Sequence, residues 1–327
     1  MMGPTMLVLS VALASYAVVS TLMSAAAAAV WRAGLIDRDH PAPATRAWRL
    51  TSLRALPSVG AALVTVIVVV PGYLAFEPRQ ESEAVGPVLL ALAVMGAWLL
   101  ATGVLIASRA VLATWRLERA WLSTAAPIAF NPPAGVPAFV VETLAPVVAL
   151  VGVFSPKLVA AQSVIDACSE QELARIVAHE RGHLRSRDNL RRWLIAAAPD
   201  VLRWTADHDD IAAAWSGAAE DAADDAATSG ERMARAELAA LLVKIAGLAP
   251  TASWTAATVS PFVEADGLDR RVRRLLEDDA APARSNWPAF GRLVGVGATI
   301  LLVAGPFNAA VRQATHEVVE TIVDLGR

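Results

Sequence analysis

The sequence contains one cysteine and almost no surplus of charge. Because Cys168 has no second cysteine to pair with, an internal disulfide framework is excluded. The net charge of −3 over 327 residues offers no basic surface of the kind that attracts nucleic acid, so we expect no direct nucleic-acid binding. Histidine is also rare, with five in the chain, so a pattern that brings two of them together is informative.

The chain is instead rich in apolar residues, which make up 56% of it, more than is usual in a soluble protein. Three runs, residues 4–30, 59–76 and 85–108, can each cross a bilayer as a helix, for which about 20 residues suffice. The first run has the alternative of a cleavable signal peptide. No basic residue precedes it and it exceeds the apolar length of such peptides, so we expect a retained span. A fourth run covers residues 288–311.

The distribution of arginine predicts the orientation of these spans. Residues 31–58 hold five arginines against two aspartates, and a basic flank with Arg109, Arg116 and Arg119 follows the third run. Basic residues favour the cytoplasmic side, so we expect an N-terminus outside a bacterial inner membrane and a cytoplasmic domain after the third span. The expected division is a membrane domain at 1–112, a cytoplasmic domain at 113–286, and a fourth span with a short external tail at 287–327.

A turn-rich break at residues 131–137 separates the spans from several short β-branched runs. These runs are residues 138–141, 147–153 and 157–160. Glu142, Pro146 and Pro156 interrupt them, which favours the strands of a small sheet; a membrane hairpin is the alternative. An edge strand of such a sheet can hold an extended peptide by backbone pairing.

Residues 169–183 predict the helix on which the chemistry of the chain depends. Ser169 and Glu172 form a capping box at its start, and the helix contains the motif His-Glu-x-x-His. His179 and His183 are four residues apart, so they lie on one helix face and can bind a single metal ion.

Glu180 lies beside these histidines, where its carboxylate can accept a proton from water at a zinc ion. A catalytic zinc ion needs one more protein ligand and an open position. The helix predicted at 208–228 contains Glu-x-x-Ala-Asp, in which Glu220 is the candidate third ligand and Asp224 an acceptor that orients a ligand histidine. Small alanines would let this helix approach the motif helix closely. The alternative is that these acidic residues form a solvated helix face.

Other polar residues near the motif receive supporting roles. Asp188 is expected outside the ligand set, where it fixes the end of the motif helix or pairs with Arg185 or Arg192. His208 is expected on the surface, and the arginines at 270–274 on a solvated or membrane-facing basic surface. Both are candidates for a second oxyanion donor. Further helices are predicted at residues 189–198, 231–248 and 268–277.

The chain resembles the BlaR/MecR-type antirepressor metallopeptidases of bacterial membranes, a gluzincin family with HExxH and ExxAD motifs. The stretch from His179 to Asp188 is similar to the family signature H-E-x-x-H-x-x-x-x-D. The resemblance implies an α-helical membrane protein with an α+β gluzincin-like metalloprotease domain and four transmembrane helices, three before the domain and one after it. Sensor members carry a large extracellular ligand-binding domain after the fourth span. This sequence ends at Arg327, so β-lactam sensing is not carried over.

These features predict a membrane-embedded endopeptidase that uses one zinc ion and cleaves a cytoplasmic or membrane-associated protein or peptide. A transcriptional repressor is one candidate substrate. Two alternatives remain open: a processing or quality-control protease like the HtpX and CaaX-prenyl proteases, which share the zinc ligands, and a non-catalytic signalling protein with a structural zinc site. The presence of Glu180 favours catalysis, because a structural site does not need a general base.

Overall fold

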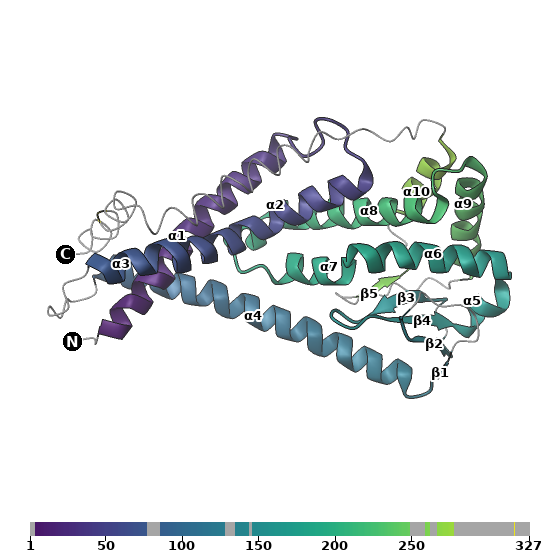
Figure 1. The fold of residues 1–327 in the computed structure, drawn as a ribbon, viewed down its shortest axis with the longest axis horizontal. Helices are drawn as coiled ribbons and strands as arrows, with labels where there is room; N and C mark the ends of the chain where they lie inside the picture. The colour runs from purple at the N-terminus through teal and green to yellow at the C-terminus, as the bar shows by residue number, and fades with distance from the viewer. Residues whose placement is uncertain are drawn as a thin grey trace.

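The computed structural model describes residues 4–76, 86–127, 135–143, 146–248, 259–261, 267–277 and Glu317. The fourth apolar run predicted at 288–311 lies outside the described residues. The described chain consists of a group of long helices and, beside them, a small sheet covered by shorter helices (Figure 1).

Long helices form the N-terminal part of the chain, as the apolar runs predict. They are α1 (Pro4–Arg32), α2 (Pro43–Val64), α3 (Val70–Phe76) and α4 (Pro87–Leu122), and a π-helical turn, η1 (Thr65–Val69), joins α2 to α3. Three stretches are long and apolar enough to cross a membrane: Thr5–Arg32, Pro43–Ala75 and Pro87–Leu122. Among the described residues, the chain therefore has three candidate membrane spans.

Two of these helices are longer than the apolar runs that predict them. Most of the segment 31–58, expected as a linker, is helical because α2 begins at Pro43, and α4 continues past residue 108 to Leu122. Hydropathy marks only the part of a helix that lipid surrounds, whereas packing and backbone propensity decide where the helix ends. The extension of α2 is held by two buried arginines, Arg49 and Arg54, which bond to other parts of the chain.

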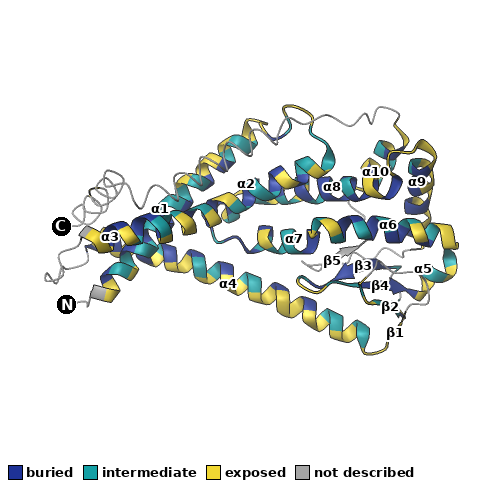
Figure 2. Cartoon of the chain, in the orientation of Figure 1, coloured by how far each residue is buried: buried dark blue, intermediate teal, exposed yellow. Residues whose placement is uncertain are grey.

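The spans pack closely around α1, which contacts both α2 and α4. A Cβ atom at Gly96 of α4 would lie 2.1 Å from the carbonyl oxygen of Leu13 in α1, so only glycine permits this approach. α4 also exposes large apolar side chains, among them Leu90, Val94 and Val104. Figure 2 shows such exposed residues along much of α4, as expected of a helix that faces lipid.

The strands predicted after the spans form one sheet with the order β1-β2-β4-β3-β5. Its strands are β1 (Ala126–Pro127), β2 (Ala138–Val141), β3 (Val148–Val151), β4 (Lys157–Ala161) and β5 (Val259–Pro261). β2 and β4 are parallel, and the other neighbours are antiparallel. The prediction that this region forms the strands of a small sheet is confirmed. β3, the strand in contact with the motif helix, is paired on its outer side by β5, so it is not an edge of the sheet.

Helices enclose the main core together with the sheet. α5 (Gln162–Ala167) and α6 (Glu170–Ser186) contact the strands, and α8 (Ala206–Thr228), α9 (Arg232–Gly247) and α10 (Leu268–Leu276) complete the core. Leu150 and Leu158 of the sheet, Ile176 of α6 and Leu242 of α9 are buried in one hydrophobic cluster. This burial orients α6, because its apolar stripe must face the sheet. The described part of the chain is thus a helical membrane protein with a small mixed domain of helices and strands.

The chain between α6 and α8 lies against the spans. It contains α7 (Asp188–Ala197) and the 3₁₀ turn η2 (Val201–Trp204), and α7 contacts both α2 and α4 (Figure 1). Trp204 stacks on Trp98 of α4 with ring centroids 4.5 Å apart, and the Tyr16 hydroxyl of α1 donates a hydrogen bond of 2.7 Å to the Pro199 carbonyl. The mixed domain and the spans therefore share a packed junction.

Candidate metal centre

The motif helix α6 begins as its sequence predicts. The Glu172 amide donates to the Ser169 hydroxyl at 3.3 Å, and the Ser169 amide donates to the Glu172 carboxylate at 2.7 Å, which completes the capping box. Leu173 and Ile176 face the hydrophobic core. The motif residues follow further along the same helix and are buried as well.

α8 approaches α6 closely at the motif. A Cβ atom at Gly182 would lie 3.0 Å from the Cα atom of Ala223, so the small residues predicted to permit a close approach are in contact. Ala218, Ala219 and Ala223 of α8 are buried. This packing places Glu220 and Asp224 of α8 against the histidines of α6.

Three side chains offer donor atoms to one point. His179 Nε2 and His183 Nε2 are 3.1 Å apart, and the Glu220 carboxylate oxygens lie 3.5 Å from the first and 3.4 Å from the second. The three donor atoms lie within 4.8 Å of one another, and all three residues are buried. The structure thus brings together His179, His183 and Glu220, which the sequence proposes as the ligand set.

Two aspartates lie behind the histidines. Asp224 Oδ1 is 3.0 Å from His179 Nδ1, and Asp188 Oδ2 is 2.8 Å from His183 Nδ1. The second contact forms because Arg187, at the end of α6, has a left-handed backbone with φ 55°, which turns the chain so that Asp188 comes back onto His183. Asp188 therefore contacts a candidate ligand from behind, and Arg191 Nη1 lies 3.8 Å from its other oxygen.

This arrangement fits a metal ion. We assign the Nδ1 proton of each imidazole to its aspartate, which leaves both Nε2 lone pairs pointing at the same point. Two lone pairs 3.1 Å apart repel each other unless a proton or a cation lies between them. Ligand atoms about 2.1 Å from a tetrahedral ion are about 3.4 Å apart, close to the separations of 3.1, 3.4 and 3.5 Å in the cluster.

The carboxylates around the site change the pKa values of the imidazoles. Burial alone lowers the pKa of an imidazole, but Glu220 and Asp188 outweigh it and raise the pKa of His183 to about 10. Burial opposes ionisation of His179 in the same way, yet Asp224 and Glu220 raise its pKa. A cation that binds to this cluster therefore replaces protons.

Glu180 is buried beside the donor atoms, and its environment is unlike that of the other carboxylates. Neither carboxylate oxygen has a hydrogen-bond partner among the residues that the structure describes. Burial, the dominant effect, raises the pKa of Glu180 to about 7. A carboxyl group with this pKa is well matched to accept and donate protons near neutral pH.

Arg271 of α10 belongs to the same cluster, although the basic stretch at 270–274 was expected on a solvated or membrane-facing surface. That expectation is wrong for Arg271, whose side chain is only 3% exposed and contacts both Glu220 and Asp224. A signal for its burial exists in the sequence. Leu268, Arg271 and Leu275 recur at helical spacing, and Leu275 is buried in the core.

His208 lies away from the donor cluster. It was expected on the surface, and that expectation is wrong. It is half-buried at the start of α8, and its Nδ1 accepts a hydrogen bond of 2.9 Å from Arg54 Nε of α2. Burial and the neighbouring Arg54 and Arg203 lower the pKa of His208, which fits a neutral acceptor. The expectation failed because Arg54 is 154 positions away along the chain.

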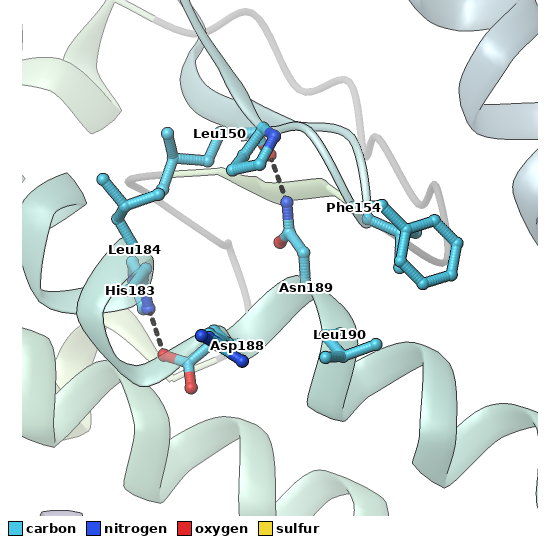
Figure 3. Close-up of a pocket in the computed structure, with 10 residues that line it drawn as sticks. Leu150, Phe154, His183, Leu184, Asp188, Asn189 and Leu190 are labelled. Atoms are coloured by element: carbon cyan, nitrogen blue, oxygen red, sulfur yellow. Dashed lines mark hydrogen bonds and ion pairs between the residues drawn. The ribbon is translucent and has the colours of Figure 1, made fainter. Parts of the chain in front are cut away.

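A cavity of about 380 Å³ opens where the turn between β3 and β4 meets the junction of α6 and α7. Figure 3 shows Leu150, Phe154, Leu184 and Leu190 around it, with the contact between His183 and Asp188 on one side. Most of its wall is apolar. Of the three donor residues only His183 lines the cavity, so it lies on the Asp188 side of the centre.

Candidate membrane spans together with a buried His-Glu-x-x-His and glutamate donor set define the class of membrane metallopeptidases. Within that class, the profile of the BlaR1 peptidase M56 family matches residues 78–275, more than half of the chain, and the chain belongs to this family. The match confirms the resemblance drawn from the motifs. Comparison with curated proteins gave no significant match, and neither did comparison with solved structures.

Proposed function

We propose that the chain is a zinc-dependent endopeptidase in which His179, His183 and Glu220 hold one zinc ion and Glu180 is the general base. The observation that carries the proposal is the buried convergence of three donor atoms within 4.8 Å beside a carboxylate that has no hydrogen-bond partner among the described residues. Two imidazoles and one glutamate form the ligand set of known zinc peptidases and leave a fourth position open.

In this proposal, bound zinc would act as a Lewis acid that polarises the scissile carbonyl, and it would lower the pKa of water to about 7. Glu180 accepts the proton of the attacking water and delivers it to the leaving amine. Asp188 accepts a hydrogen bond of 2.8 Å from His183 Nδ1, and Asp224 Oδ1 lies 3.0 Å from His179 Nδ1 as its ion-pair partner. These two aspartates would keep both Nε2 lone pairs directed at the metal. None of the described residues is assigned as a second oxyanion donor.

The proposed topology follows from the arginine distribution. The N-terminus lies outside a bacterial inner membrane, and the gluzincin-like domain, residues 113–286, lies in the cytoplasm between the membrane domain at 1–112 and a fourth span within 287–327. The packed junction of α7 and η2 with the spans supports a site close to the membrane surface. The proposed substrate is therefore a cytoplasmic or membrane-associated protein, and a transcriptional repressor is one candidate.

Two other functions predict different behaviour. A processing or quality-control protease of the HtpX or CaaX type would use the same site on other substrates. A non-catalytic signalling protein with a structural metal would not depend on Glu180. The burial of Glu180 favours catalysis, because a carboxylate without partners among the described residues lowers stability and needs a compensating use.

The test compares full-length wild-type protein in detergent with Glu180→Gln and, as a matched control, Glu170→Gln at the exposed start of the same helix. Metal content and hydrolysis of casein are measured. We expect about one zinc per chain in all three proteins, and loss of hydrolysis only in Glu180→Gln. Wild type without metal would contradict the ligand set, and equal hydrolysis by wild type and Glu180→Gln would contradict the mechanism.

A further inference from the structure

The basic side chains of α10 reach the acidic face of α8, beside which α10 lies in Figure 1. Arg270 donates hydrogen bonds of 2.8 and 2.6 Å to Asp221, and Arg274 pairs with Asp225. These two arginines are partly exposed and contact no donor of the metal centre. They dock α10 on α8, with the modest energies of solvent-accessible ion pairs.

Arg271 makes a different kind of contact from the same helix. Its Nε and Nη2 donate to the two oxygens of Asp224 at 2.9 and 2.6 Å, and its Nη1 lies 3.0 Å from Glu220 Oε2. A planar guanidinium thus holds two carboxylates at once, with a two-pronged bond to one of them. Such forked bonds fix the orientation of a carboxylate as well as its charge.

Both carboxylates act on the donor cluster. The Asp224 oxygen bound by Nη2 also lies 3.0 Å from His179 Nδ1, and the Glu220 oxygen bound by Nη1 lies 3.5 Å from His179 Nε2. Arg271 therefore contacts the groups that face both ring nitrogens of His179. A displacement of its guanidinium would change the position of a ligand oxygen and the support of a ligand imidazole together.

The charge of Arg271 also matters, because the site gathers several buried carboxylates. Glu180, Asp188, Glu220 and Asp224 are all buried around the two histidines. Carboxylates that are removed from water repel one another unless cations compensate them. A guanidinium suits this place better than an ammonium group, since it remains charged when buried and reaches both acceptors in a fixed geometry.

We propose that Arg271 is a positioning residue of the metal centre, which sets Glu220 for metal binding and Asp224 for its bond to His179, so that metal affinity depends on the guanidinium. The inference rests on the proposed function for its metal. It separates Arg271 from Arg270 and Arg274, which join the same two helices without contacting the donor set.

The test measures the zinc dissociation constant of the full-length protein in detergent, by competition with a chromophoric chelator, and the visible spectrum of the cobalt-substituted protein. The variants are Arg271→Met and Arg271→Lys, with Arg270→Met and Arg270→Lys as matched controls on the same helix. We expect Arg271→Met to weaken zinc binding by about 10- to 100-fold, as the loss of a group that supports metal ligands does. Arg271→Lys should give an intermediate loss and an altered cobalt spectrum, while both Arg270 variants keep wild-type values.

Thermal unfolding of the metal-free proteins separates a local effect from loss of the fold. If Arg271→Met does not fold, the comparison of Arg271→Lys with Arg270→Lys decides. Wild-type affinity and spectrum in Arg271→Lys, or an equal loss in Arg270→Lys, would overturn the inference and leave the proposed function standing. A wild-type protein that binds zinc but does not cleave protein would overturn the proposed function alone, and one that binds no zinc would overturn both.

Discussion

Arg54 of α2 and Asp200, between α7 and η2, form an ion pair of 2.6 Å in which both side chains are completely buried. Ser58 donates to the same Asp200 oxygen at 2.6 Å, and Arg54 also donates to His208 at 2.9 Å. The cluster joins a candidate span to the start of α8, whose later turns carry Glu220. This cluster is therefore one of the polar contacts that link the packing of the candidate spans to the position of the candidate metal centre, together with the Arg32–Asp207 ion pair and the Tyr16–Pro199 hydrogen bond.

Replacing one partner of this ion pair is expected to destabilise the protein more than replacing both partners together. Arg54→Met or Asp200→Asn leaves one partner buried without its counter-charge, which typically costs about 3–5 kcal/mol. The double variant Arg54→Met/Asp200→Leu should recover part of that loss, as measured by thermal unfolding in detergent. Arg273→Met is the control, because Arg273 and Asp269 form an exposed pair and its loss should be undetectable. A double variant as unstable as the sum of the single ones would contradict the expectation.

The stability of the metal-free protein should depend on Glu180 through pH. Burial raises the pKa of Glu180 from 4.5 to about 7, so the folded state binds this proton more tightly than the unfolded state. The resulting stabilisation is complete below pH 4.5 and is lost as pH rises through about 7. Relative to Glu180→Gln, chelator-treated wild type should therefore lose about 3 kcal/mol across this range. Melting temperatures of the two proteins measured over pH check this, and parallel curves would refute it.

Asp188→Asn should weaken metal binding. In the wild type, the Asp188 carboxylate lies 2.8 Å from His183 Nδ1. The amide of the variant provides no charged acceptor there, so the imidazole is less firmly held with Nε2 toward the metal. We expect an affinity loss of about 10- to 100-fold in chelator competition. Asp166→Asn, on an exposed turn of α5, should change nothing. An unchanged affinity in Asp188→Asn would limit this aspartate to closing the turn after α6.

Gly96→Ala should destabilise the packing of α4 on α1. The added Cβ would lie 2.1 Å from the Leu13 carbonyl oxygen, so the two helices must separate. Gly247→Ala is the matched control, since nothing lies within 4 Å of a Cβ at that exposed helix end, and it should be neutral or slightly stabilising. In detergent, the melting temperature of Gly96→Ala should therefore fall below that of wild type, whereas that of Gly247→Ala should be equal or slightly higher. Equal melting temperatures in the two variants would show that α1 and α4 adjust without strain.

Features that depend on residues close together in the sequence were predictable from the sequence alone. The capping box of Ser169 and Glu172, the shared face of His179 and His183, and the apolar runs of the spans each follow from spacing within one element. The third donor, Glu220, was also found, because Glu-x-x-Ala-Asp is a local pattern on α8. Helix ends were less predictable: α2 starts at Pro43 because its polar turns pack on the mixed domain.

The sequence by itself determined three candidate spans, the three strands β2, β3 and β4, the motif helix and the residues that offer metal donors, since periodicity and side-chain chemistry act over a few residues. Only the tertiary structure decided that Asp188 turns back onto His183, that Arg271 binds Glu220 and Asp224, and that Arg54 pairs with Asp200. A charged side chain carries no local sign of its partner when that partner is distant in the chain. Its burial becomes favourable only after packing has removed water and brought the opposite charge into contact.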